Sequence, residues 1–198
     1  MSTDIYKMVD LTKRCRSPCP LSGVVHSMVN VLVTGQPRVG KTTIIARILA
    51  ESNKSAIGFI TKEIREKGYR IGFDIETLSG IVKPLASKKG KPSKYRVGSY
   101  NVYVENVDFV VDYLKAKIES GTNYDLIVLD EIGKMELYSD SFKEFVSYCL
   151  KQKNVLGTIM MRDNDFTAQI KSRSDTRIFN LTEENRITIQ RNIMELMK

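Results

Sequence analysis

Eight consecutive residues have the types and the spacing of a loop that binds phosphate: Gly35-Gln36-Pro37-Arg38-Val39-Gly40-Lys41-Thr42. They match G-x-x-x-x-G-K-[ST], in which backbone N–H groups surround phosphate oxygens while the lysine reaches the β- and γ-phosphates. We therefore expect residues 35–43, which include Thr43, to bind a nucleoside triphosphate. In this hypothesis Lys41 is catalytic and the Thr42 hydroxyl ligates Mg²⁺. A plain glycine turn between a strand and a helix is the alternative.

Two acids, Asp130 and Glu131, directly follow four apolar residues at 126–129. An acid at the end of a buried strand is typical of the magnesium-binding half of such a site. We expect Asp130 to face Mg²⁺ through a water molecule. A neighbouring carboxylate can orient and deprotonate a water for attack on the γ-phosphorus, so Glu131 is the predicted catalytic base. The alternative for Glu131 is an acid at the start of a helix.

Strands and helices alternate along the chain, and this pattern predicts the elements that must position these residues. The expected strands cover residues 29–34, 56–63, 69–78, 95–104, 124–129, 155–160 and 177–181. The expected helices cover residues 41–51, 105–119, 139–151 and 166–172, and a closing helix begins at 182. The turn signal at 66–68 predicts an antiparallel hairpin. The result is an α/β fold whose parallel sheet carries an antiparallel insertion.

The two ends of the chain give further expectations. Residues 1–28 contain Pro18, Pro20 and Gly23, which break regular structure, and we expect them to form an N-terminal extension before a domain at 29–198. At the other end, Thr182 and Asn185, with the acids at 183 and 184 between them, resemble a helix N-cap followed by an acidic first turn.

Composition narrows the class of protein. Apolar residues make up 42% and charged residues 27% of the 198, which is typical of a globular domain. The apolar stretches are far shorter than a membrane span needs, so we expect no membrane partner. The N-terminus lacks the apolar core of a secretory signal, so we expect a cytoplasmic protein. We also expect a monomer. Lysine and arginine total 31 against 23 acids, giving a net charge of +8 that suits a polyanionic partner. Much of the excess is interpreted as a solvated loop, formed by Lys83, Lys88, Lys89, Lys91, Lys94 and Arg96.

The sequence resembles the THEP-type nucleoside-triphosphatase family. The matching stretches are residues 33–43, 58–65, 70–74, 78–80, 96–100, 130–137, 156–159 and 182–186. The resemblance implies a three-layer, RecA-like P-loop fold with a mostly parallel sheet, and a catalytic glutamate after the magnesium aspartate. It also implies hydrolysis of ATP, GTP, CTP and UTP with little base preference and without DNA. Arg38 departs from the family, which usually has glycine there, so either its backbone is strained or the loop shifts.

The sequence is compatible with more than one function and with more than one role for several residues. A nucleotide or nucleoside kinase, a nucleic-acid-dependent ATPase and a non-enzymatic nucleotide switch are alternatives to a hydrolase. Thr158 could sense the γ-phosphate or could be a buried strand hydroxyl, and Phe73, Tyr100 and Tyr103 are expected to pack in the core or the hairpin. A further cation is needed for the transition state, and the candidates are Arg38, Arg65, Arg70, Lys134, Arg162 and Arg186. Arg65 and Lys134 are favoured because each lies in a family-matching stretch near a strand end, and a surface ion pair is the alternative for either.

Overall fold

The computed structural model describes residues 29–152 and 154–197, so the expected N-terminal extension at 1–28 lies outside the described residues. Its strands are β1 (Asn30–Gly35), β2 (Ala56–Glu66), β3 (Tyr69–Thr77), β4 (Val82–Ser87), β5 (Arg96–Val97), β6 (Tyr100–Val102), β7 (Leu126–Ile132), β8 (Val155–Ile159) and β9 (Thr176–Leu181). Its helices are α1 (Lys41–Glu51), α2 (Val104–Glu119), the 3₁₀ helix η2 (Glu136–Tyr138), α3 (Asp140–Gln152), α4 (Asp165–Lys171) and α5 (Arg186–Leu196).

All nine strands form one mixed sheet in the order β5-β6-β4-β3-β2-β7-β8-β1-β9. The block from β2 to β9 is parallel, because β2 pairs parallel with β7, β7 with β8, and β1 with both β8 and β9. The strands β3, β4, β6 and β5 extend the sheet with antiparallel pairs. The strand β8 lies between β1 and β7, which confirms the predicted RecA-like arrangement of the two candidate motifs.

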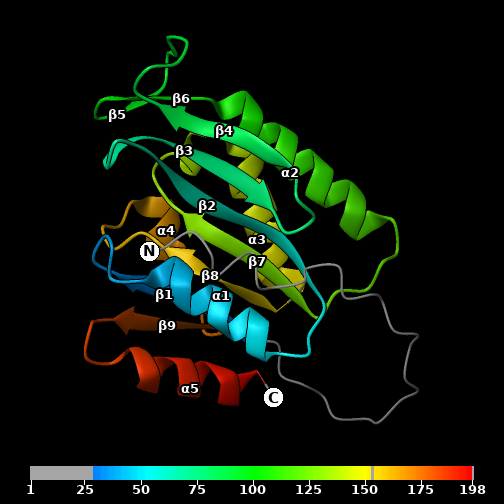
Figure 1. The fold of residues 1–198 in the computed structure, drawn as a ribbon. Helices are drawn as coiled ribbons and strands as arrows, with labels where there is room; N and C mark the ends of the chain where they lie inside the picture. The colour runs from blue at the N-terminus through cyan, green and yellow to red at the C-terminus, as the bar shows by residue number, and fades with distance from the viewer. Residues whose placement is uncertain (1–28, 153, 198) are drawn as a thin grey trace.

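Helices cover both faces of the sheet and give the three predicted layers (Figure 1). Apolar side chains of α2 and α3, such as Val107 and Phe145, form one core with Leu32 and Leu129 of the sheet. Side chains of α1 and α5 form a second core on the opposite face, and this core includes Val128 of β7. Alternate residues of β7 therefore face opposite layers, and Asp130 follows Val128 onto the face that α1 covers.

The antiparallel part is larger than the predicted hairpin. The hairpin of β2 and β3 is confirmed, but it is followed by the unpredicted strand β4, and the expected strand at 95–104 is two short strands, β5 and β6. The interpretation of the basic run as one solvated loop is wrong at Lys83, which lies in β4 with its Nζ 4.3 Å from the centroid of the Phe109 ring. Phe73 and Tyr100, both expected to pack in the core or the hairpin, pack against each other with ring centroids 5.3 Å apart.

Two further expectations need correction. The strand β7 runs to Ile132, so Asp130 and Glu131 belong to the strand instead of following it, and Glu131 does not begin a helix. The last helix begins at Arg186, not at Thr182, because the Asn185 side chain accepts a hydrogen bond from the Thr182 N–H and donates one to the Asn180 carbonyl. Across the described part of the chain, every helix is too short or too polar to cross a membrane.

Candidate active site

The glycine loop connects β1 to α1 at the carboxyl edge of the parallel sheet. Its first glycine, Gly35, has φ = 147°, and a Cβ there would lie 2.5 Å from the Leu181 carbonyl oxygen of the neighbouring strand β9. Gly40 has φ = 99° and precedes the first turn of α1, whose free N–H groups and partial positive charge point into the loop. Both positions require glycine, and together they form a backbone cradle suited to phosphate oxygens.

Arg38 has a left-handed backbone, with φ = 68°, inside this loop. Of the two outcomes expected for an arginine at this position, the structure has the strained angle. A left-handed conformation costs a residue with a Cβ about 1–2 kcal/mol. The side chain of Arg38 is exposed, so the loop gains no buried contact from it.

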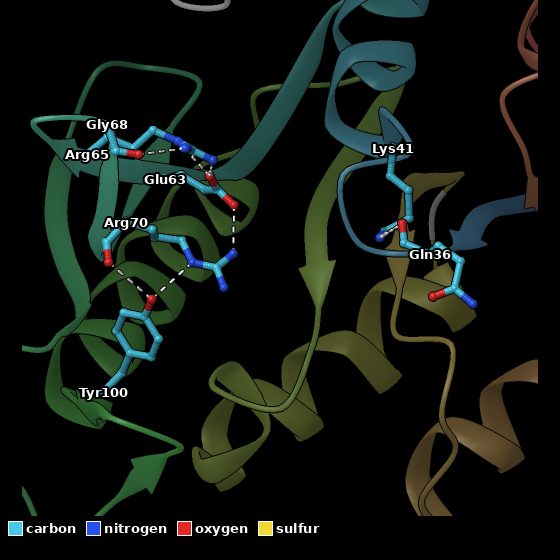
Figure 2. Close-up of polar contacts among 7 residues, drawn as sticks. All are labelled: Gln36, Lys41, Glu63, Arg65, Gly68, Arg70 and Tyr100. Atoms are coloured by element: carbon cyan, nitrogen blue, oxygen red, sulfur yellow. Dashed lines mark hydrogen bonds and ion pairs between the residues drawn. The ribbon is translucent and has the colours of Figure 1, made fainter.

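Lys41 is directed toward its own loop. Its Nζ donates a hydrogen bond to the Gly35 carbonyl at 3.2 Å. It donates another to the Gln36 carbonyl at 3.4 Å (Figure 2). The ammonium group therefore lies across the phosphate cradle at the first turn of α1. It supplies a positive charge at the position that the motif assigns to the β- and γ-phosphates.

Asp130 is almost fully buried, with 1% of its surface exposed, and it is linked to both neighbouring elements of the site. The Thr158 hydroxyl of β8 donates a hydrogen bond of 2.5 Å to Asp130 Oδ1. Burial raises the pKa of Asp130 to about 6, although hydrogen bonds from Thr158 and from Thr42 at the start of α1 favour the charged form. The structure thus brings Asp130 together with Thr42 of the loop, as the sequence predicted.

Glu131 is half-buried and lies beside a second acid that sequence reasoning did not single out. A Cβ on Gly133 would lie 3.4 Å from Glu131 Cγ and 2.9 Å from Glu136 Oε2, so both carboxyl groups flank this glycine. Glu136 is 3% exposed and accepts a hydrogen bond from the Thr61 hydroxyl of β2 at 3.3 Å. Burial and the charge of Glu131 raise the pKa of Glu136 to about 8, which favours its neutral form.

Two of the candidate transition-state cations are committed to contacts within the antiparallel part. Arg65 and Arg70 bind the two oxygens of Glu63, at 2.6 Å and 2.8 Å, and Arg70 Nε also donates to the Tyr100 hydroxyl at 3.0 Å. Figure 2 shows this cluster on one side of the strand that ends between it and Lys41. Arg70 thereby joins β3 to β2 and β6, whereas Arg65 binds within β2 and to the Gly68 carbonyl of the turn that follows it.

The other candidate cations lie in different places. Lys134 and Arg162 are exposed in the segments that follow β7 and β8. Arg186 is the first residue of α5, and its Nε donates a hydrogen bond of 2.9 Å to the Val39 carbonyl of the glycine loop. Among the six candidates, Arg186 is the one that the structure joins to the loop by a hydrogen bond from outside it.

Comparison with known proteins agrees with this geometry. The profile of a family described as NTPase matches residues 30–194, which include the glycine loop, Asp130, Glu131 and Arg186. The chain belongs to this NTPase family. The family and the fold together show that this protein is an enzyme of the NTPase class.

Relatives of this NTPase cover most of its length. It is 40% identical over 171 residues to the nucleoside-triphosphatase THEP1 of Thermotoga maritima, across 86% of the chain and 96% of that relative. It is 39% identical over 171 residues to the human cancer-related nucleoside-triphosphatase, across 79% of the chain and 90% of the relative. The crystal structure of THEP1 from Aquifex aeolicus is similar with a TM-score of 0.75 at 34% identity, covering 86% of this chain and 99% of that one.

Proposed function

We propose that this NTPase hydrolyses Mg²⁺-bound nucleoside triphosphates, including ATP, GTP, CTP and UTP, to the diphosphate and phosphate. In this proposal residues 35–43 bind the phosphates and Lys41 neutralises the β- and γ-phosphates. The carboxylate of Glu131 orients the attacking water and accepts its proton. The observation that carries the proposal is that Asp130 and Glu131 adjoin in one strand while Asp130 is linked to Thr42 of the phosphate loop.

The buried side chain of Asp130 fits a divalent cation. Its Oδ2 is inaccessible to solvent and has no hydrogen-bond partner within the described ranges, and an unpaired buried carboxylate oxygen is costly unless a cation or a cation-bound water approaches it. No cluster of three or more possible metal-ligating side chains exists in the described part of the chain. Mg²⁺ commonly uses one or two protein ligands together with substrate phosphates, and Asp130 and Thr42 would be such ligands.

Thr42 and Asp130 would hold this Mg²⁺, the first through its hydroxyl and the second through a water molecule. The ion would supply neutralisation of the charge that develops on the β- and γ-phosphate oxygens. Thr158 holds Asp130 in position from the neighbouring strand, and this contact maintains the orientation of the carboxylate. The remaining chemistry depends on the Glu131 carboxylate, which is closer to solvent than the Asp130 carboxylate.

Phosphate release from each of the four triphosphates tests the proposal, in Mg²⁺ and in excess EDTA, for the wild type and Glu131→Gln. The glutamine keeps the shape of the side chain but cannot accept the proton. Positioned acid–base groups contribute about 10²–10⁴ in rate, so hydrolysis should fall by that factor while affinity changes little. EDTA should abolish the wild-type activity.

Glu119→Gln is a matched control, because Glu119 is an exposed acid at the end of α2. This variant should retain wild-type activity. If Glu131→Gln lowers affinity while the single-turnover rate of bound nucleotide stays intact, Glu131 is a metal-binding or structural residue and the proposed base is wrong. Transfer of phosphate to an added acceptor in place of water would indicate the kinase alternative.

A further inference from the structure

Arg186 approaches the glycine loop from the side opposite to the two acids. Its Nε donates to the Val39 carbonyl, and a Cβ on Gly40 would lie 3.7 Å from Nε and 3.9 Å from Cζ, so the guanidinium lies directly against the loop. A second edge of the group, Nη2, lies 3.6 Å from Glu183 Oε1. These two contacts use edges of the guanidinium, yet 45% of the side chain remains exposed.

The order of the strands determines which end of a bound triphosphate reaches Arg186. Along the carboxyl edge the order is β7, β8, β1, β9, and Arg186 follows β9. Neighbouring strands are about 4.8 Å apart, so the axes of β7 and β9 are separated by about 14 Å. Under the proposed function the γ-phosphate lies toward the acids of β7. The chain of phosphates must then run across the glycine loop toward β9, and the nucleoside lies at the far end.

The same distance bears on the role of the arginine. With the γ-phosphate toward β7, a guanidinium on the β9 side of the loop lies toward the end of the triphosphate that carries the sugar and base, and away from the water that Glu131 would activate. A planar guanidinium whose edges are held by the protein can offer its face to an aromatic ring, and arginine faces stack on nucleobases.

We propose that Arg186 forms the nucleoside subsite of this NTPase, with the nucleobase stacked on its guanidinium. The inference rests on the proposed function for the direction of the triphosphate. Every base has a π-face, so a stacked contact of this kind binds purines and pyrimidines alike. The hydrogen bond to Val39 then has a second use, because it holds the stacking surface at a fixed position relative to the phosphate cradle.

A comparison of ligands with and without a nucleoside tests this subsite. Binding of inorganic tripolyphosphate and of the β,γ-imido analogues of ATP and UTP, each with Mg²⁺, is measured by calorimetry. The proteins are the wild type, Arg186→Ala, Arg186→Lys and Arg191→Ala. Arg191 is an exposed arginine of the same helix, five residues on, which places it on a different side of α5.

We expect Arg186→Ala to lower the affinity for both nucleotide analogues roughly 5- to 100-fold, which is the range that base stacking reaches. The affinity for tripolyphosphate should change by less than about twofold. Arg186→Lys keeps a cation and a donor for Val39 but has no planar face, so it should show the same selective loss. Arg191→Ala should bind all three ligands as the wild type does.

Equal weakening of all three ligands would overturn the proposal, since it would make Arg186 a support of the loop or a phosphate ligand. Unchanged nucleotide affinity in Arg186→Ala, or full affinity in Arg186→Lys, would overturn it as well. These experiments measure the binding of ligands and do not depend on hydrolysis. If the wild type binds the analogues but releases no phosphate from ATP, the proposed hydrolysis is wrong. The subsite is then still tested by the binding affinities of the Arg186 variants.

Discussion

The buried acid Glu136 should make the stability of this protein fall as pH rises, and Glu136→Gln should remove that dependence. Burial and the neighbouring charge of Glu131 raise the pKa of Glu136 from 4.5 to about 8. The unfolded chain releases this proton near pH 4.5, whereas the folded protein keeps it until about pH 8. Between these values the folded state binds more protons than the unfolded state, so the free energy of unfolding decreases with increasing pH.

The magnitude follows from the same interval. When the folded state binds one proton more than the unfolded state, the free energy of unfolding falls by about 1.36 kcal/mol for each pH unit. The range from pH 4.5 to about 8 therefore corresponds to roughly 5 kcal/mol. That is a large share of the 5–15 kcal/mol that holds most domains together. Glutamine has almost the same shape, can still accept the hydrogen bond from Thr61, and carries no ionisable group. The free energy of unfolding of the variant should therefore increase relative to that of the wild type by about 1 kcal/mol per pH unit from pH 5 to pH 8.

Urea denaturation of both proteins at pH 5, 6, 7 and 8 measures this difference. Contributions from titrating groups that do not interact with Glu136 cancel when the wild-type free energy of unfolding is subtracted from that of the variant at each pH. The difference should rise steadily toward pH 8. A difference that stays constant within about 0.5 kcal/mol would show that Glu136 is already ionised in the folded protein, and the argument from burial would be refuted.

Three further variants test the loop and its partner strand. Lys41→Ala removes the mobile cation of the glycine loop and should weaken nucleotide binding and abolish turnover together; unchanged affinity and rate would exclude the P-loop assignment. Arg38→Gly relieves the left-handed backbone, so unfolding free energy should stay level or rise by up to about 1 kcal/mol and hydrolysis should not slow. A loss of activity near 10³-fold with folding intact would instead make Arg38 a transition-state cation. Thr158→Val removes the hydroxyl that donates from β8 to Asp130 Oδ1 and should lower the unfolding free energy by about 1.5–3 kcal/mol, as measured in urea.

The phosphate loop and its flanking elements could be predicted because local pattern and tertiary structure agree there. The helix α1 has the predicted bounds, and the predicted strand before it differs from β1 by one residue at each end. The proximity of Asp130 to the glycine loop could also be predicted, because the carboxyl ends of parallel strands lie at the same edge of a sheet. The contacts of Arg186 and Glu136 could not, because they depend on which segments fold back onto this edge.

The strand β4 shows why part of the sheet was missed. Its sequence contains Pro84, which lacks an N–H, and Lys83, so its local preference for a strand is weak. The pairing with β3 has a register shift between Phe73 and Asp74, next to the residue that pairs with Pro84. Leu85, which is fully buried, anchors the segment in the core. Tertiary burial and this irregularity outweigh the local preference.

The pairing of β1 has a consequence for how the protein forms during synthesis. This strand precedes the glycine loop and leaves the ribosome before any other strand of the described chain, yet it pairs with β8 and β9. The antiparallel strands β2, β3 and β4 can pair with their neighbours as they emerge, at low loop-closure entropy. The phosphate cradle, in contrast, has no partner strand for β1 until β8 has been translated, and it has both neighbouring strands only after Leu181. Nucleotide thus cannot assist the early steps of folding, and its stabilising effect on the nascent chain begins only after most of the protein has been made.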